Sequence, residues 1–268
     1  MFQQFYGFQR LPFSRDIPPA DLFPADGQTE LCARLTYLTK ERGLGLLTGE
    51  TGCGKSTAVR RFTSSLDTNR YFVIYLANPL LGISGLYREF LTALGYEPLF
   101  SRPKMVARIR SALEDLLLSK HRTPLIILDE AQLLPAPAFE QLRLLFSSHM
   151  DSQSLGALLL VGQTELRRTL RLALHEAFSQ RLTTSFHLPP LDLAQSLAYI
   201  RHNIQFSGYK GGTLFTDDAL TRIYDYTKGI PRQINRLCTT ALLVGVSEQK
   251  QILEESSIRK AIAELDQT

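Results

Sequence analysis

A run of eight residues near the start of the chain combines three glycines with a lysine and a serine, at a spacing suited to phosphate chemistry. The glycines allow backbone turns that other residues resist, and they let N–H groups approach phosphate oxygens. A lysine at this position reaches the β- and γ-phosphates of a nucleotide, and the serine hydroxyl ligates Mg²⁺. The run therefore predicts a phosphate-binding loop at the start of a helix. The predicted nucleotide-binding residues are Gly49, Glu50, Thr51, Gly52, Cys53, Gly54, Lys55, Ser56 and Thr57.

Two adjacent acids form the second chemical group. Asp129 and Glu130 follow the apolar run Leu125–Leu128, which has the composition of a buried strand. Sheets that alternate with helices bind ligands at the carboxyl ends of their strands. We expect Asp129 to hold Mg²⁺ together with Ser56, directly or through water. We expect Glu130 to polarise the water that attacks a γ-phosphate beside Lys55.

Three more polar residues lie where they could act on a γ-phosphate. Gln163 follows the strand predicted at Ala157–Val161 and is expected to orient water; a plain strand-ending residue is the alternative. Arg181 precedes the last predicted strand, and Arg232 begins a helix after Gly229. Either arginine could stabilise charge on the γ-phosphate. The alternative for both is a solvated surface charge.

These side chains need a scaffold, and the first 190 residues alternate between strand and helix patterns. The alternation predicts an α/β fold in which helices flank a central parallel five-stranded sheet. The strands are expected at Leu44–Thr48, Tyr71–Leu76, Leu125–Leu128, Ala157–Val161 and Thr184–Leu188. The helices are expected at Glu30–Arg42, Ser56–Leu66, Gly85–Leu94, Met105–Lys120 and Pro137–Met150, with another from Glu165.

The composition changes at a proline pair that ends at residue 190, and only helical patterns follow. Asp192 and Thr216 are expected to cap two of these helices. We therefore expect a nucleotide-binding α/β domain over residues 1–190 and a helical lid domain over residues 191–268. The aromatic N-terminal arm, which prolines interrupt, is expected to strap across the core, with covering the nucleotide base as the alternative. The expected lid helices are Leu193–Phe206, Asp217–Tyr226, Ile230–Glu248 and Ser256–Leu265.

Composition bounds the remaining possibilities. The chain has 268 residues, a formal net charge of +4, and three cysteines without paired or metal-type spacing. The mildly basic charge permits an anionic partner, and such cysteines fit a reducing cytosol. The sequence shows no signal peptide and no apolar run of about 18 residues, so we expect a cytoplasmic protein without a membrane partner. The guanine motif Asn-Lys-x-Asp and the transporter motif Leu-Ser-Gly-Gly do not occur, which argues against both of those nucleotide-binding classes.

The order of these motifs resembles that of AAA+ ATPases. More closely, the chain resembles the ExeA/GspA family and its transposition relatives of the TniB, TnsC and MuB type. The resemblance covers nearly the whole chain and implies an AAA+ fold with ATP and Mg²⁺ as cofactors. The motifs that carry it are Phe5-Tyr6-Gly7-Phe8, Pro12-Phe13-Ser14, Leu47-Thr48-Gly49-Glu50-Thr51-Gly52, Asp129-Glu130-Ala131-Gln132, Val161-Gly162-Gln163 and Gly229-Ile230-Pro231-Arg232-Gln233-Ile234-Asn235.

The same resemblance implies roles for individual residues. It implies that Gln163 is sensor 1 and that Arg232 is sensor 2, which contacts the nucleotide. It further implies that copies of the chain assemble into a ring or filament, in which Arg181 is the finger offered to a neighbouring subunit. Three nearby arginines are alternatives for this finger: Arg167, Arg168 and Arg171.

Three functional classes remain open within the resemblance. The first is an ATPase that assembles on duplex DNA and recruits or regulates a transposase. The second is an ATPase that assists assembly of type II secretion, and the third is a nucleotide-dependent signalling switch. ExeA proteins continue into a membrane span and a peptidoglycan-binding domain, which this sequence lacks, so the first class is expected.

The proposed DNA contacts rest on a basic segment at the start of one predicted helix. In DNA-binding relatives the corresponding segment faces the interior of the ring. Arg102, Lys104 and Arg108 are therefore expected to contact DNA phosphates irrespective of base sequence. A solvated helix face is the alternative interpretation of the same charges.

Overall fold

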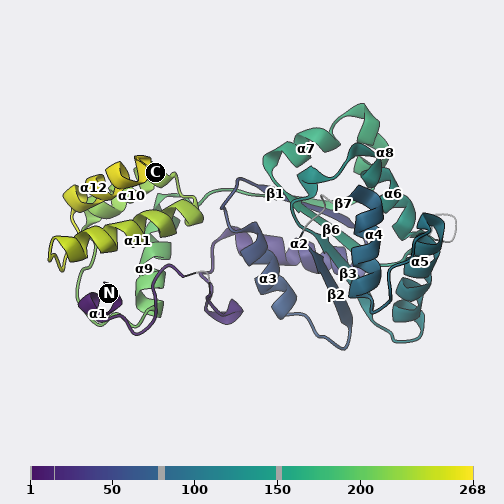
Figure 1. Cartoon of the computed structure of the whole chain (residues 1–268), viewed down its shortest axis with the longest axis horizontal. Helices are drawn as coiled ribbons and strands as arrows, with labels where there is room; N and C mark the ends of the chain where they lie inside the picture. Colours follow the sequence, from purple (N-terminus) through teal and green to yellow (C-terminus); the bar gives the residue numbers. More distant parts are fainter. Residues whose placement is uncertain (1, 15, 78–81, 149–152, 268) are drawn as a thin grey trace. The chain divides into compact units, whose positions relative to one another are not determined.

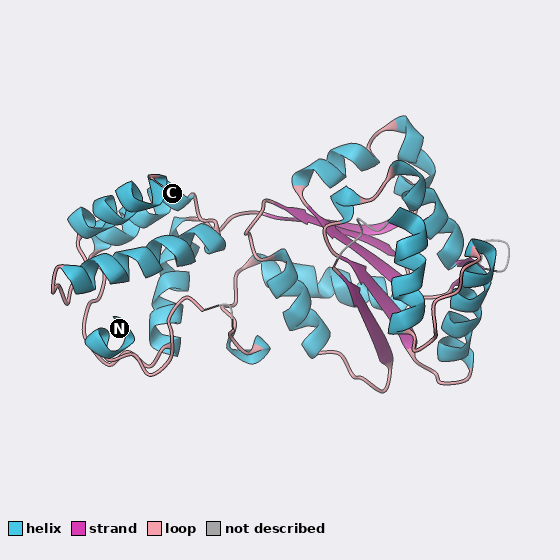
Figure 2. Cartoon of the chain, viewed as in Figure 1, coloured by secondary structure: helices cyan, strands magenta, loops and turns pink. Residues whose placement is uncertain are grey.

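The computed structural model describes residues 2–14, 16–77, 82–148 and 153–267. The chain forms two compact units (Figure 1). The first, called here the α/β unit, consists of Asp26–Glu50 and Lys55–Leu188. The second, called the helical unit, consists of Met1–Ala25, Thr51–Gly54 and Pro189–Thr268. Figure 2 shows that the long strands lie in the α/β unit and that helices dominate the other.

The α/β unit is built on a parallel five-stranded sheet, which confirms the predicted architecture. The strand order is β2-β3-β6-β1-β7, so β6 lies between the two strands that precede the predicted phosphate and acid groups. Short, mainly apolar runs form the three central strands, which are buried because both faces of the sheet are covered there, whereas the outer strands β2 and β7 are only partly buried. The strands are β1 (Leu44–Gly49), β2 (Tyr71–Leu76), β3 (Thr123–Leu128), β6 (Ala157–Gly162) and β7 (Leu182–Leu188).

Helices connect the strands, mostly where the sequence places them. The longer helices of this unit are α2 (Gly27–Glu41), α3 (Lys55–Ser64), α4 (Gly82–Ala93), α5 (Arg102–Leu118), α6 (Ala136–Phe146) and α7 (Thr164–Leu170). Shorter elements are η3 (Ala131–Leu133), η4 (Ala173–His175), α8 (Glu176–Ser179) and the antiparallel pair β4 (Ser147–Ser148) and β5 (Gln153–Ser154).

The prediction of a helix over Pro137–Met150 is wrong at the C-terminal end. Helix α6 ends at Phe146, because Ser147 adopts an extended conformation and pairs with Ser154. The rest of the expected range, residues 149–150, lies outside the described residues.

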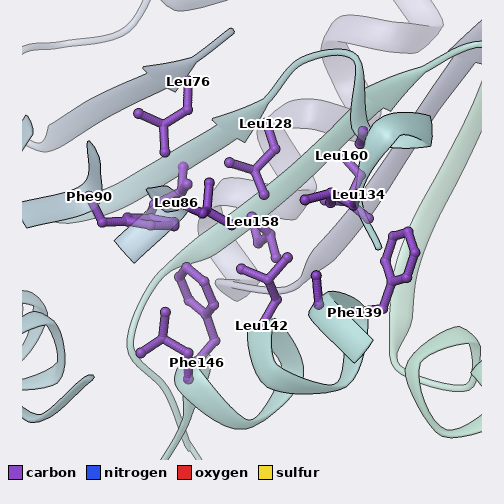
Figure 3. Close-up of a cluster of buried hydrophobic side chains, with 14 of the residues drawn as sticks. Leu76, Leu86, Phe90, Leu128, Leu134, Phe139, Leu142, Phe146, Leu158 and Leu160 are labelled. Carbon is purple, nitrogen blue, oxygen red and sulfur yellow. The ribbon is translucent and has the colours of Figure 1, made fainter. Parts of the chain in front are cut away.

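Side chains alternate between the two faces of the sheet, with the period of two that strands impose. On one face, Leu128, Leu158 and Leu160 join a cluster that includes Phe90 of α4 and Leu142 of α6. Figure 3 shows these side chains interdigitating between the strands and the helices. Residues from α4, α5, α6, α7 and α8 all contribute to this cluster, so these helices cover one face.

The opposite face packs on α2 and α3. Gly45 of β1 lies directly beneath α2, because a Cβ atom there would be 2.5 Å from Cδ2 of Leu38 and 3.3 Å from Cδ1 of Leu159. Leu47 and Val161 are fully buried, and both lie one residue out of phase with the cluster on the other face. The two-sided burial fixes the register of the strands and therefore the positions of the loops that follow them.

The helical unit contains α1 (Phe2–Tyr6), η1 (Pro19–Asp21), α9 (Leu193–Phe206), α10 (Asp217–Thr227), α11 (Pro231–Ser247) and α12 (Glu255–Asp266). The expected caps are confirmed: Asp192 accepts from the N–H of Gln195 at 2.8 Å, and Thr216 accepts from that of Ala219 at 3.3 Å. None of the described helices is both long and apolar enough to cross a membrane.

The N-terminal arm belongs to the core of the helical unit. Tyr6, Phe8 and Phe13 are buried there, and the Tyr6 hydroxyl donates a 3.0 Å hydrogen bond to the carbonyl oxygen of Lys250. Burial raises the pKa of Tyr6 to about 12. The arm thus packs with the C-terminal helices in one compact unit. The division into two domains at residue 190 stays a prediction.

Candidate active site

Two glycines shape the turn between β1 and α3. Gly52 and Gly54 have φ values of +90° and +94°, a region that residues with a side chain rarely adopt. Gly49 is required for a different reason, because a Cβ atom there would lie 2.6 Å from the carbonyl oxygen of Leu188. The expectation that all three glycines serve the turn therefore holds for two of them, whereas the third permits close packing of β1 against β7.

Lys55 begins α3 and folds back over the loop that precedes it. Its Nζ donates hydrogen bonds of 2.9 Å to the carbonyl oxygens of both Gly49 and Glu50. Only 8% of the residue is exposed, so a positive charge is held at the carboxyl end of β1. Among the other predicted loop residues Cys53 is buried, Thr57 is half-buried, and the exposed ones are Glu50, Thr51 and Ser56.

Ser56 and Asp129 meet at the same edge of the sheet. The Ser56 hydroxyl donates a 2.8 Å hydrogen bond to Oδ2 of Asp129, and the Tyr75 hydroxyl donates a second one of 2.6 Å to the same oxygen. Oδ1 of Asp129 accepts from the N–H of Glu130 at 2.9 Å. The aspartate is 5% exposed, so three donors hold a buried carboxylate in one orientation.

Tyr75 was not anticipated from the sequence. It lies on β2, whose last residue, Leu76, accepts the backbone N–H of Asp129 at 2.9 Å. Burial raises the pKa of Tyr75, and the neighbouring Asp129 raises it further, so the hydroxyl stays protonated and remains a donor. No pattern in the strand marks this residue, since its role depends on which strand pairs with β3.

Glu130 has a constrained backbone and a held side chain. Its φ of 51° lies in the left-handed region, which is uncommon for residues other than glycine. The side chain is exposed, and its Oε2 accepts a 2.6 Å hydrogen bond from Nε2 of Gln132. Oε1 of Gln132 in turn accepts the backbone N–H of Gln163 at 3.1 Å. Gln132 thus links the predicted catalytic acid to the predicted sensor, a connection that the sequence did not reveal.

Gln163 directly follows β6 and precedes the first residue of α7. Because β6 pairs with β1 on one side and β3 on the other, its end lies between the two strands that carry the phosphate-binding loop and the acids. The order of the strands thus brings the loop, Asp129, Glu130 and Gln163 to one edge of the sheet.

Arg181 lies at the opposite, amino ends of the strands. The residue after it, Leu182, pairs with Leu44 at the start of β1, whereas the phosphate-binding loop follows the end of β1. Strand β1 has six residues, and at about 3.3 Å per residue its two ends lie roughly 20 Å apart. The structure therefore does not bring Arg181 to the loop of its own subunit. Its Nη1 donates a 3.1 Å hydrogen bond to Oγ of Ser147, beside a cavity of about 250 Å³ that Arg143 also lines.

Arg232 lies in the helical unit, in the first turn of α11. Its backbone N–H donates a 3.2 Å hydrogen bond to the carbonyl oxygen of Gly52, which belongs to the same unit. A Cβ atom at Gly52 would lie 2.8 Å from Cβ of Arg232. The absence of a side chain at Gly52 therefore serves this close contact as well as the turn.

The basic segment forms the first turns of α5, and two of its three predicted DNA contacts are engaged within the chain. Nη2 of Arg102 donates a 2.9 Å hydrogen bond to Oε1 of Gln141, and the guanidinium of Arg108 lies 4.2 Å from the centre of the Tyr96 ring. Lys104 is exposed.

No group of three or more histidine, cysteine, aspartate or glutamate side chains that could hold a metal occurs within the described part of the chain. The predicted Mg²⁺ site rests instead on one hydroxyl and one carboxylate, from Ser56 and Asp129. Both offer hard oxygen ligands, which Mg²⁺ prefers, so these two residues fit the ion.

Comparison with known proteins places these features in a family context. Residues 38–170 match the model of an AAA domain. General secretion pathway protein A of Aeromonas hydrophila is 32% identical over 271 residues, which cover 99% of this chain and 48% of the relative. The chain therefore spans about half the length of this relative.

Solved structures share the fold at low sequence identity. Cdc6p from Pyrobaculum aerophilum aligns with a TM-score of 0.72 and 15% identity, over 94% of this chain and 70% of that one. The ADPNP–ADP complexes of the Aeropyrum pernix ORC2 protein align with a TM-score of 0.66 and 19% identity, over 94% and 71%. The Thermotoga maritima RuvB Holliday junction branch migration motor aligns with a TM-score of 0.61 and 17% identity, over 97% and 73%. Residues 38–170 therefore match an AAA domain, the fold is the P-loop AAA fold that the solved structures share, and the sequence is similar to general secretion pathway protein A.

Proposed function

We propose that the chain binds ATP and Mg²⁺ at the carboxyl ends of the central strands β1, β3 and β6. It hydrolyses the bond between the β- and γ-phosphates there. The observation that carries this proposal is the 2.8 Å hydrogen bond between Ser56 and Asp129. It joins the phosphate-binding loop to the acidic strand end, and phosphoryl transfer needs both groups in one place.

Each residue of this edge has a distinct task in the proposal. Lys55 and the loop N–H groups bind the phosphates, while Ser56 and Asp129 hold Mg²⁺. When bound, Mg²⁺ neutralises charge on the β- and γ-phosphate oxygens. Glu130 polarises the attacking water, and Gln163 orients that water. The αL backbone of Glu130 supports its role, because strained conformations of this kind cluster at active sites.

Arg232 is proposed as a second nucleotide contact. Its backbone hydrogen bond to Gly52 supports this role, because it ties the start of α11 to the turn of the phosphate-binding loop. The Arg232 guanidinium carries a permanent positive charge and presents several N–H donors, which suits a phosphate oxygen.

Arg181 is proposed to act on the nucleotide of a neighbouring copy. Its position at the amino ends of the strands supports action between subunits, because the roughly 20 Å length of a strand separates it from its own loop. The proposal thus includes assembly of copies into a ring or filament, as the resemblance to AAA+ ATPases implies.

For the cellular role, we propose an assembly ATPase that acts in a pathway like that of general secretion pathway protein A, the relative named above. A second candidate is a DNA-assembling ATPase that serves a transposase. The observation that favours it is the exposed Lys104 beside Arg102 at the start of α5. Arg102 and Arg108 are exposed as well, and each also has a partner within the chain.

Calorimetric titration of ATP in the presence of Mg²⁺ tests the nucleotide site directly. Lys55→Ala should weaken binding by at least about tenfold, since the phosphate charge loses its counter-ion. Lys40→Ala is the matched control, because Lys40 is an exposed lysine of the same unit on α2. Equal affinities for the wild type and Lys55→Ala would contradict the proposed site.

A further inference from the structure

Gln132 bridges two parts of the candidate site that the chain reaches from different strands. Its amide nitrogen donates to Oε2 of Glu130 at 2.6 Å, and its amide oxygen accepts from the backbone N–H of Gln163 at 3.1 Å. Glu130 follows β3, whereas Gln163 follows β6. One side chain therefore connects the end of one strand to the end of the next.

The orientation of the Gln132 amide follows from its partners. A backbone N–H can only donate, so the atom that faces Gln163 has to be the amide oxygen. The carboxylate of Glu130 can only accept while it is ionised, so the atom that faces it has to be the amide nitrogen. Both partners select the same orientation, and neither hydrogen bond would survive a flip of the amide.

The end of the Gln132 side chain also lies close to the backbone of Gly162. A Cβ atom at Gly162 would lie 2.7 Å from Oε1 of Gln132, closer than such atoms approach in proteins. The glutamine amide therefore occupies space from which a side chain at residue 162 would displace it. A displacement of the turn between β6 and α7 would move the N–H of Gln163 and the backbone of Gly162 together.

From this geometry we infer that Gln132 is a positioning residue, which sets the orientation of the Glu130 carboxylate according to the position of the β6–α7 turn. Its donor holds Oε2 of Glu130 and leaves Oε1 for the water. A shift of the Gln163 backbone releases the amide and with it the carboxylate. The inference rests on the proposed role of Glu130 in hydrolysis and adds the means by which Gln163 communicates with it.

The test separates the backbone of Gln163 from its side chain. Gln163→Ala removes the side chain and keeps the N–H, whereas Gln163→Pro removes both. Proline is compatible with this position because Gln163 precedes helix α7 and has a φ of −79°. Each variant is made in the wild-type and the Gln132→Ala backgrounds, and kcat, KM for ATP, ATP affinity and thermal unfolding are measured.

Gln132→Ala should lower kcat by about tenfold or more while ATP affinity stays within about twofold, as expected when a catalytic group loses its orientation. Gln163→Pro should have a several-fold lower kcat than Gln163→Ala in the wild-type background. This difference should vanish in the Gln132→Ala background, because the N–H has lost its acceptor. Leu133→Ala, an exposed neighbour on η3, is the control and should keep the wild-type kcat.

Gln132→Glu supplies a second variant of nearly the same shape. It can still accept from Gln163 but presents a like charge to Glu130, so kcat should fall at least as far as in Gln132→Ala. A wild-type kcat in both Gln132 variants would overturn the inference. The inference would also be overturned if the ratio of kcat between Gln163→Pro and Gln163→Ala were the same in the wild-type and Gln132→Ala backgrounds. Glu130→Gln, measured alongside, distinguishes this failure from that of the proposed function, since normal turnover there removes Glu130 itself from catalysis.

Discussion

The Ser56 hydroxyl donates a 2.8 Å hydrogen bond to Oδ2 of Asp129, although 73 positions separate the two residues in the sequence. The two are brought together because β1 and β3 are parallel and flank β6, so that both strands end at the same edge of the sheet. The same order of strands places Gln163 between them. The fold thus assembles the phosphate-binding loop, a candidate metal-binding carboxylate and a candidate water-activating acid.

Tyr75→Phe should impair Mg²⁺-dependent nucleotide binding. The change removes the 2.6 Å hydrogen bond to Oδ2 of Asp129 and keeps the aromatic ring. Loss of such a supporting partner typically costs about tenfold or more in metal affinity. A fluorescent ATP analogue titrated at a series of Mg²⁺ concentrations should therefore require about tenfold more Mg²⁺ for half-maximal binding. Tyr71→Phe, at the other end of β2, is the control; an unchanged Mg²⁺ dependence in Tyr75→Phe would remove Tyr75 from the site.

The sequence was sufficient for the features that repeat locally. The three central strands β1, β3 and β6 are mainly apolar runs with turn residues beside them, and the phosphate-binding loop has fixed spacing, so both could be predicted. The acids Asp129 and Glu130 could be predicted because they end such a run. The predicted range of helix α6 is too long at its C-terminal end. The two serines that form β4 carry no apolar pattern that would separate a short strand from the end of a helix.

Contacts between distant segments could not be predicted in the same way. Tyr75 meets Asp129 because β2 pairs with β3, and the side-chain pattern of β2 contains no sign of its partner. Gln132 appeared only as part of a motif, and its contacts depend on how closely β6 lies beside β3. Such pairings follow from the order of the strands, which the periodicity of single segments does not specify.

Arg181→Ala should leave ATP binding by the single chain intact and lower hydrolysis where copies meet, by on the order of 10³-fold if it acts as an arginine finger. Mixing Arg181→Ala with Lys55→Ala should restore part of the activity, because the first supplies an intact nucleotide site and the second an intact arginine. Phosphate release from the mixture, compared with each variant alone, measures this recovery.

Ser147→Ala is the control for Arg181, because it removes the 3.1 Å hydrogen bond to the guanidinium and keeps the charge. Its rate of hydrolysis should stay near that of the wild type. A mixture that assembles, as shown by mass photometry, but recovers no activity would argue against action between subunits.

Charge reversal at Arg102 and Lys104 distinguishes the two cellular roles. If both contact DNA, changing them to glutamate should weaken duplex binding for all base sequences alike and flatten its salt dependence by roughly one unit of slope per lost contact. Anisotropy of a fluorescent duplex at several salt concentrations, with an ATP analogue present, measures both effects. Lys40→Glu with Arg70→Glu makes the same change in net charge at exposed positions elsewhere in the unit. Equal slopes for the wild type and the Arg102 and Lys104 double variant would exclude this surface, and absence of wild-type binding would exclude the transposition role.

The proposed hydrolysis of ATP depends on Lys55, Ser56, Asp129 and Glu130 together. Its most direct test is phosphate release by Glu130→Gln, measured together with ATP affinity. The amide cannot polarise water, so hydrolysis should fall by about 10²-fold or more, while ATP affinity stays within about twofold of the wild type. Phosphate release by Glu130→Gln at the wild-type rate would show that the Glu130 carboxylate does not activate the attacking water.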